Sequence, residues 1–237
     1  MTPWQIFIQE VQLHLKALRA ANCADPYFRG HACEDWQLLP SLSREWNNPR
    51  FNANKEKRLF WEFRMKGSHL LPPGISEWTT LYYMQHYGLP TRLLDWTTCL
   101  ATAVYFAISD NPTSPCVWIL DPYQLNSLTI GREISNLNAS FQKDYLDFLS
   151  HKIPGAIAAD GDSSIHRIHS QRGAFTVHAD LALPLNKFAP DALKRFKIPV
   201  DAIDDARLFL ELAGTNAFSI FPDLVGLAKE IRCKELS

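Results

Sequence analysis

Residues 85–107, QHYGLPTRLLDWTTCLATAVYFA, restrict the fold more than any other stretch of the chain. Gly88 and Pro90 interrupt regular structure, so residues 87–90 must form a turn. Thr91–Trp96 then predicts a strand, and the apolar block Leu100–Ile108 predicts a buried helix directly after it. The core of the fold therefore combines strands with helices.

Polar and aromatic side chains are crowded into the first half of this stretch. Seven of them lie within thirteen residues: His86, Tyr87, Thr91, Arg92, Asp95, Trp96 and Thr97. Polar groups packed against a core element must hydrogen-bond to each other or to a ligand. On a strand, Leu93 and Asp95 would face one side and Arg92 the other. Asp95 can line a ligand site or cap the following helix, and the two roles can coexist.

A second polar feature is Arg29, which precedes Gly30 in the short aromatic segment YFRG at residues 27–30. The planar guanidinium suits a phosphate or a carboxylate. The glycine lets a ligand or another strand come close to the backbone. The structural alternative is a buried ion pair of Arg29 with Asp95 or with Glu34 that ties two strands together.

A third feature is the polar segment HSQRGAF at residues 169–175. It predicts a turn between two strands, Ile165–Ile168 and Ala174–His178, and it follows an exposed loop predicted at residues 158–162. Gln171 in this turn could orient a substrate amide or hydroxyl. The alternative is an ordinary hairpin turn with Arg172 in solvent.

The remaining elements complete an α+β fold. Thr2 as N-cap, Pro3 at the first helical position and the apolar spacing that follows predict a helix over residues 3–20. Cys116–Leu120 predicts a strand, and further helices are predicted at residues 141–149, 201–213 and 223–233. No repeat period and no linker divides the chain. We therefore expect one domain over residues 1–237.

Composition argues against several classes of partner. The formal net charge of −1 provides no global field toward nucleic acid or an anionic membrane. The start of the chain does not predict a signal peptide and no apolar run could span a bilayer, so we expect a cytoplasmic protein without membrane contact. One local basic patch could still guide a nucleic-acid strand: Arg44, Arg50, Lys55, Lys57 and Arg58.

Metal ligation is also not predicted. The five cysteines are scattered and form no C-x-x-C pair. His166, His169 and His178 share no metal-ligand spacing with a cysteine or a carboxylate pair. We therefore expect neither a structural zinc site nor a disulfide framework.

Six motifs taken together resemble one known family. They are YFRGH at 27–31, WQLLPSLSR at 36–44, QHYGLPTRLLDWT at 85–97, AVYFA at 103–107, QRGAFTVH at 171–178 and FPDLVGLAKEI at 221–231. In order and spacing they resemble the FRG domain family, which is bacterial and phage-associated. The resemblance extends over about residues 25–231, so a single FRG domain is expected.

The resemblance implies a core like that of the ADP-ribosyltransferases, with a mixed or antiparallel sheet and flanking helices. In those enzymes an arginine or histidine on a first strand holds NAD, a polar strand and its helix line the nicotinamide site, and a turn before a later strand completes it. Arg29, the strand Arg92–Thr97 and Gln171 would take these places. The implied catalytic residues are Asp95, Gln171 and His86, and the implied NAD-binding residues are Arg29, Gly30, Tyr87, Arg92 and Thr97.

The implied function is transfer of ADP-ribose from NAD, without a metal, to RNA, DNA or protein. Such an enzyme would act as a toxin or phage-defence effector, and a neutralising antitoxin protein would be a partner. Two alternatives stay open. One is a metal-independent nuclease toxin that uses His86, Arg29 and Asp95 as acid, phosphate clamp and orienting group. The other is a non-catalytic sensor that binds a nucleotide in the same pocket.

Overall fold

The structure is a computed structural model that describes residues 1–46, 48, 51–109, 111–131, 145–149, 153–161 and 165–236. Its centre is a six-stranded sheet in the order β4-β5-β2-β1-β3-β6. Every neighbouring pair in this sheet is antiparallel. The strands are β1 (Tyr27–His31), β2 (Leu93–Thr97), β3 (Cys116–Leu120), β4 (Ala156–Asp160), β5 (Gly173–His178) and β6 (Leu193–Lys197).

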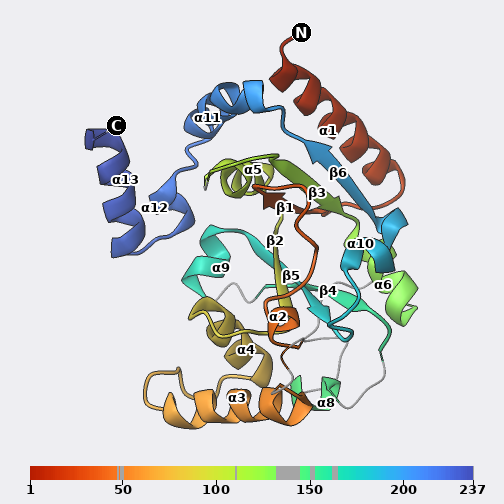
Figure 1. The fold of residues 1–237 in the computed structure, drawn as a ribbon, viewed down its shortest axis with the longest axis vertical. Coiled ribbons are helices and arrows are strands. Elements are labelled where there is room, and N and C mark those ends of the chain that lie inside the picture. The colour runs from red at the N-terminus through yellow and green to blue at the C-terminus, as the bar shows by residue number, and fades with distance from the viewer. Residues whose placement is uncertain are drawn as a thin grey trace.

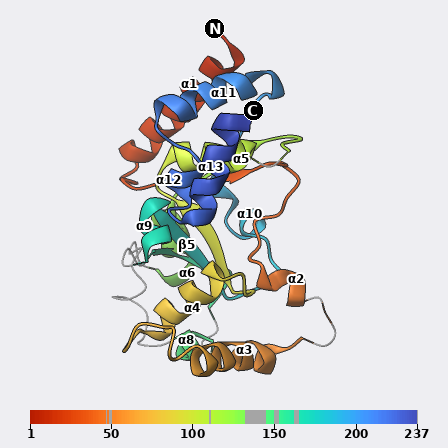
Figure 2. The ribbon, with the colours of Figure 1, turned by 90° about the vertical axis from the view of Figure 1, so that its left-hand side faces the viewer.

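Helices surround the sheet (Figure 1). The longer ones are α1 (Pro3–Ala20), α3 (Ala53–Lys66), α4 (Glu77–His86), α5 (Leu100–Ile108), α6 (Pro122–Ile130), α11 (Ile203–Leu212) and α13 (Leu224–Leu236). The shorter ones are α2 (Leu42–Trp46), α8 (Tyr145–Phe148), α9 (His166–Ser170), α10 (Leu185–Phe188), α12 (Ala217–Ile220) and the 3-10 turns η1 (Pro190–Ala192) and η2 (Val200–Ala202). Figure 2 shows α12 and α13 above α9, with α4 below them.

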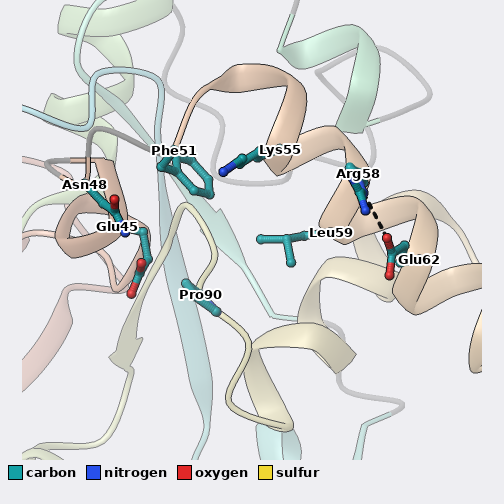
Figure 3. A pocket seen from close by; sticks show the side chains of 8 residues that line it. All are labelled: Glu45, Asn48, Phe51, Lys55, Arg58, Leu59, Glu62 and Pro90. Carbon is teal, nitrogen blue, oxygen red and sulfur yellow. Dashed lines mark hydrogen bonds and ion pairs between the residues drawn. The ribbon is translucent and has the colours of Figure 1, made fainter.

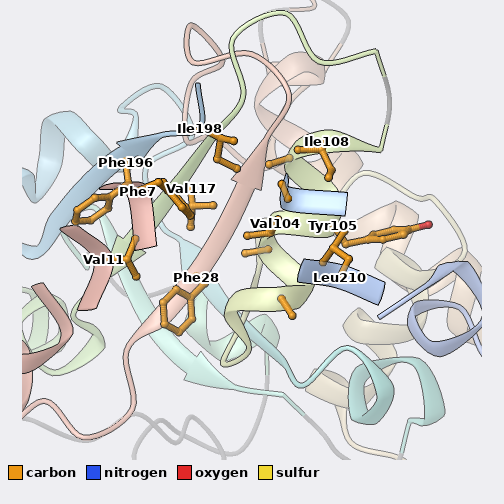
Figure 4. Packing of buried hydrophobic residues seen from close by; sticks show 14 of the residues in the cluster. Phe7, Val11, Phe28, Val104, Tyr105, Ile108, Val117, Phe196, Ile198 and Leu210 are labelled. Atoms are coloured by element: carbon orange, nitrogen blue, oxygen red, sulfur yellow. The ribbon is translucent and has the colours of Figure 1, made fainter. Parts of the chain in front are cut away.

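The first helix forms as its sequence predicts. Thr2 and Gln5 make a reciprocal capping box, which satisfies backbone N–H groups that the first turn leaves free. Phe7 and Val11 are buried on one face of α1. They pack in one cluster with Phe28 of β1 and with side chains of β3, β6, α5 and α11, as Figure 4 shows.

Helix α5 lies directly on strand β1 because Gly30 has no side chain. A Cβ atom at Gly30 would lie 1.9 Å from the carbonyl oxygen of Ala103 and 2.7 Å from the backbone nitrogen of Ala107. The predicted close approach to this glycine is therefore real, and the approaching backbone is that of a helix.

A buried ion pair connects several elements at the end of the molecule away from α1 (Figure 1). The guanidinium of Arg92 binds the carboxylate of Glu56 through two hydrogen bonds of 2.5 and 2.8 Å. The Tyr145 hydroxyl donates to the same carboxylate at 2.5 Å, and Arg92 also donates to the carbonyl oxygens of His178 and Ala179. This network joins α3 and α8 to the ends of β2 and β5.

Two local predictions after residue 150 were wrong. The predicted strand Ile165–Ile168 is the start of helix α9, with Ile165 as its N-cap. Three-residue spacing puts both isoleucines on one helical face, and both are buried. Residues 158–160 of the predicted loop belong to strand β4, where Ala158 and Ala159 are fully buried, and residue 162 lies outside the described residues. Consecutive small apolar residues in this edge strand lack the polar–apolar alternation that predicts a strand.

Other predicted elements are close to the observed ones. The strand predicted at 91–96 is β2, shifted by one or two residues, and the tail helices are α11 and α13. Of the helix predicted at 141–149, the structure describes a helix only at Tyr145–Phe148, and residues 141–144 lie outside the described residues.

Candidate functional site

Strands β1 and β2 meet at one point and then separate. Their register contains the single pair Phe28↔Thr97, whereas β1 with β3 and β2 with β5 each have five pairs. Continuing the β1–β2 register would bring Arg29 opposite Trp96 and then Gly30 opposite Asp95, but neither pair forms. Instead, Nη1 of Arg29 donates to the backbone carbonyl oxygen of Asp95 at 2.5 Å. A side chain thus replaces the backbone ladder where the sheet opens.

A cavity of about 320 Å³ lies at this opening, between α5 on one side and α4 and α9 on the other. Its walls are rich in aromatic rings and in convergent polar groups. The rings belong to Phe28, Trp36, Tyr82, Trp96, Phe106 and Phe175. The polar side chains are those of Arg29, His31, Gln85, His86, Asp95, Thr97, Thr102, Arg167 and Gln171. Apolar walls with a few placed polar groups are typical of small-molecule sites.

Asp95 is the charged member of strand β2. It is exposed, while the other four residues of β2 are buried. Its Oδ2 accepts a hydrogen bond of 3.0 Å from Nε2 of Gln85, and Oδ1 has no partner among the residues described. Asp95 does not cap the following helix, because the N-cap of α5 is Cys99. The capping alternative was therefore wrong, because β2 extends to Thr97 and keeps Asp95 within the sheet.

Gln85 holds Asp95 in place. Its Oε1 accepts from the Thr91 hydroxyl at 2.5 Å, and its Nε2 donates both to Asp95 and to the backbone oxygen of Leu93. With both ends of the amide bound, the side chain has one orientation. Gln85 is the first residue of the motif at 85–97, but this role was not predicted from the sequence.

Arg29 connects the two sides of the opening. Its Nε donates to Nε2 of His31 at 3.0 Å, and Nη1 donates to the Asp95 carbonyl. Burial lowers the pKa of Arg29, and the negative charge of Asp95 opposes that change. The Glu34 alternative is excluded, because Glu34 forms ion pairs with Arg195 and Lys197. The other alternative was an ion pair between Arg29 and Asp95. The hydrogen bond that Arg29 forms with Asp95 goes to the backbone carbonyl oxygen and not to the carboxylate.

His86 and Tyr87 follow each other in sequence and lie in different environments. His86 ends α4, is half-buried and lines the cavity. Burial lowers the pKa of His86, Arg167 lowers it further, and Asp223 opposes them. Tyr87 is 68 % exposed and lies outside the cavity lining. Its ring contacts the His86 ring edge-on, with 4.7 Å between the ring centroids. The structure therefore brings His86 to the site and leaves Tyr87 at its margin.

Thr97 and Gln171 tie β2 to the turn before β5. The Thr97 hydroxyl donates to the backbone oxygen of Gln171 at 2.6 Å and accepts from the backbone N–H of Cys99. The Gln171 amide donates to the backbone oxygen of Ile220 at 3.2 Å. Both residues line the cavity, and these contacts hold its wall in place. Arg172 is exposed, as the hairpin alternative predicted, although the turn joins a helix to a strand.

Part of the chain around this cavity matches a family model. The FRG domain model matches residues 24–115. An FRG domain is therefore assigned to residues 24–115. The matched segment is shorter than the expected span of 25–231, and it ends just before β3. The comparisons found no match among curated proteins and no match among solved structures.

The FRG match contains most of the cavity but not all of it. Arg29, His86 and Asp95 belong to the matched segment, whereas Arg167 and Gln171 come from α9 and the turn that follows it. The segment after the FRG match therefore closes one wall. Phe221 continues that wall, with the Arg167 guanidinium 4.8 Å above its ring and the Phe106 ring in edge contact with it.

Arg92 is the one expected NAD-binding residue of the FRG motif that the structure places in the core. It is 7 % exposed, does not line the cavity, and is held by Glu56 as described above. The sequence could not separate Arg92 from Asp95, because the partner of Arg92 lies 36 residues earlier in the chain. Arg92 is accordingly a core ion-pair residue.

His31, Trp36 and Arg167 line the cavity but were not singled out from the sequence. His31 and Trp36 stand in quoted motifs, so their position after Arg29 was a usable signal. Arg167 stands in no motif, and only the folding of α9 against β5 brings it to the cavity. Of the predicted NAD-binding set, Arg29, Gly30 and Thr97 line the cavity, while Tyr87 and Arg92 do not.

A larger depression of about 580 Å³ lies between α2 and α3 (Figure 3). Its lining contains both charges, because Lys55 and Arg58 lie there together with Glu45 and Glu62. Arg58 is paired with Glu62 at 2.9 Å. The expected basic patch is thus partly neutralised here, and its member Arg50 lies outside the described residues. The aromatic ring of Phe51 lines this depression, but none of its polar lining residues is buried, so it is a weaker candidate than the cavity at Asp95.

Among the residues that the structure describes, no three His, Cys, Asp or Glu side chains are grouped so that they could hold a metal ion. None of the described helices combines the length and the apolar character that crossing a membrane requires.

Proposed function

We propose that the FRG domain binds NAD at the opening between β1 and β2 and transfers its ADP-ribose to an acceptor. The observation that carries the proposal is the carboxylate of Asp95, held by Gln85 at the wall of an aromatic-rich cavity that Arg29 also lines. A family name does not establish an activity, so the groups in the cavity have to support it.

The first step supported by the cavity is binding. Flat aromatic rings suit the nicotinamide ring, and Arg29 contributes a permanent positive charge that suits the pyrophosphate. A volume of about 320 Å³ is at the lower end of the range for ligand sites. The cavity would therefore enclose the nicotinamide and its ribose, and the adenylate part would extend toward the open side.

The second step is cleavage of the bond between ribose C1′ and the nicotinamide nitrogen. The bonding electron pair leaves with nicotinamide, and positive charge develops on the ribose. A nearby carboxylate stabilises such an oxocarbenium-like state, as in glycoside hydrolysis. Asp95 suits this role because its carboxyl group lies at the cavity wall and one of its oxygens has no partner among the described residues.

The third step is attack by the acceptor on C1′, with loss of the proton of the attacking group. His86 lines the same cavity, and its lowered pKa keeps the imidazole neutral at physiological pH. A neutral imidazole can accept that proton. The acceptor on this proposal is RNA, DNA or protein. The domain would then act as a toxin or phage-defence effector that a protein antitoxin neutralises.

Incubation of the full chain with NAD labelled in its adenylate part tests the proposal, with cellular protein and RNA as acceptors. Asp95→Asn keeps the shape and removes the charge, so label transfer should fall at least about 100-fold. Asp191→Asn makes the same change at an exposed carboxylate outside the cavity and should transfer label at the wild-type rate.

The outcomes separate the alternatives. Label on protein or RNA that depends on Asp95 supports transfer. Shortened RNA without label supports the nuclease, and binding of NAD without turnover supports a nucleotide sensor. Full transfer by Asp95→Asn would contradict the role of the carboxylate, and the circular dichroism spectrum of each variant reports whether it is folded.

A further inference from the structure

His31 ends strand β1 and lines the cavity, but the chemistry proposed above does not use it. Its side chain is 2 % exposed. Nε2 accepts the hydrogen bond from Nε of Arg29, while Nδ1 has no hydrogen-bond partner among the residues that the structure describes. A buried polar atom without a partner costs free energy, and folded proteins contain few of them. This atom therefore requires an explanation.

The contact with Arg29 determines which ring nitrogen of His31 carries the proton. Arg29 can only donate, so the lone pair on Nε2 of His31 faces it and the proton of the neutral ring is on Nδ1. Burial, and then the charge of Arg29, lowers the pKa of His31 to about 3. The ring is neutral at physiological pH, and Nδ1–H is a donor without an acceptor.

The surroundings of this donor are those of a ligand subsite. Trp36, which is 55 % exposed, also lines the cavity, and its ring centre lies 5.8 Å from that of His31. Arg29 on the other side of the imidazole contributes the positive charge. A flat apolar surface, a neutral donor and a cation are therefore adjacent on one wall.

We infer that His31 is a specificity-determining residue whose Nδ1–H donates to an uncharged oxygen of the bound molecule, a ribose hydroxyl or a carbonyl oxygen. An anionic oxygen has a better partner in Arg29, and it would favour protonation of a ring that burial keeps neutral. That the bound molecule is a nucleotide rests on the proposed function. The donor role of His31 rests only on the geometry.

Nitrogen-15 NMR of the histidine rings in the full chain tests the inference. The probes are nicotinamide, ribose 5-phosphate and ADP-ribose, each added separately at millimolar concentration. In the free protein, His31 should be the tautomer protonated at Nδ1. At least one probe should shift the Nδ1 resonance, with a smaller change at Nε2. A proton found on Nε2, or an Nδ1 resonance that none of the probes moves, would overturn the inference.

Two substitutions of His31 each retain the hydrogen-bonding group of one ring nitrogen and remove that of the other. In His31→Gln the amide oxygen can replace Nε2 as the acceptor for Arg29, but the donor at Nδ1 is lost. In His31→Asn the amide nitrogen can replace Nδ1, but the acceptor for Arg29 is lost. The glutamine variant should bind the responding probe roughly three- to tenfold more weakly, and the asparagine variant should bind it more tightly than the glutamine variant does. The reverse order, or unchanged binding by His31→Gln, would contradict the inference.

The same samples distinguish this inference from the proposed function. A shifted Nδ1 resonance in a protein that never turns over NAD would contradict the transferase and support the subsite. If the protein turns over NAD, no probe shifts the Nδ1 resonance and His31→Gln leaves KM unchanged, the results would support the transferase and contradict the subsite.

Discussion

The guanidinium of Arg29 donates to the backbone carbonyl of Asp95 across the point where β1 and β2 separate. This contact makes Arg29 both a structural link and a part of the cavity wall. The two interpretations of Arg29 in the sequence, an internal tie and a ligand-binding group, therefore describe one position. Variants of Arg29 should accordingly affect both stability and binding.

Replacing Arg29 by Gln should weaken the fold without abolishing it. The variant loses charged hydrogen bonds to His31 and to the Asp95 backbone, so the free energy of unfolding should fall by about 2 kcal/mol. Urea denaturation measures this, and calorimetry with NAD should show binding at least about tenfold weaker. Arg207→Gln is the control, since its pair with Asp204 is exposed and its loss should change neither quantity. Full NAD affinity in the Arg29 variant would contradict its place in the site.

Replacing Gly30 by Ala should be among the most destabilising small changes in the chain. The added methyl group would overlap the backbone of Ala103, which cannot move without displacing α5 from β1. We expect a loss of about 3 kcal/mol or more in thermal or urea unfolding. Gly74→Ala is the comparison, because a Cβ there meets no atom within 4 Å and only the positive φ of 73° opposes it. Its cost should stay near 1–2 kcal/mol. Equal costs would show that α5 can shift freely.

Replacing Arg92 by Met should affect stability and leave binding intact. The carboxylate of Glu56 would remain buried without its cation, which costs about 3–5 kcal/mol. NAD affinity measured at a temperature where the variant is folded should equal that of the wild type, because Arg92 does not line the cavity. The double variant with Glu56→Leu should recover part of the stability. If the folded single variant lost NAD affinity, Arg92 would have to contribute to NAD binding, which would contradict the prediction.

The buried histidines should make the protein less stable as the pH falls. Burial lowers the pKa of His31 and of His178 to about 3, whereas an unfolded histidine takes up its proton near pH 6.5. Between these values the unfolded chain binds more protons than the folded one. The stabilising contribution is therefore complete above about pH 6.5 and is lost progressively as the pH falls toward 3.

His31→Gln isolates one of these groups. Between pH 6 and pH 4.5 the dependence of the unfolding free energy on pH should become less steep by about 1.4 kcal/mol per pH unit, because one proton no longer distinguishes the two states. Urea titrations at several pH values measure the slope. Above pH 7.5 the difference in stability between the two proteins should be constant. An unchanged slope would show that His31 takes up a proton in the folded state.

Local chemistry was enough to predict several elements and the family. The capping box and apolar spacing of α1 act within one turn, and the order of β2 and α5 follows from a strand-like run next to an apolar block. The motifs at Arg29 and at residues 85–97 are contiguous, so the FRG assignment did not depend on knowing what they contact. At Ile165–Ile168 the segment was too short for its periodicity to distinguish a strand from a helix, and the same rules wrongly predicted a strand.

The roles of the polar residues depended on contacts between segments that are distant in the chain. Arg92 and Asp95 are three residues apart in one motif, yet Glu56 draws the first into the core and the opening beside β1 exposes the second. Arg167 joins the cavity only because α9 packs on β5. A charged side chain is free for a ligand only where the fold supplies no closer partner, and such partners belong to the packed chain, not to the sequence around the residue.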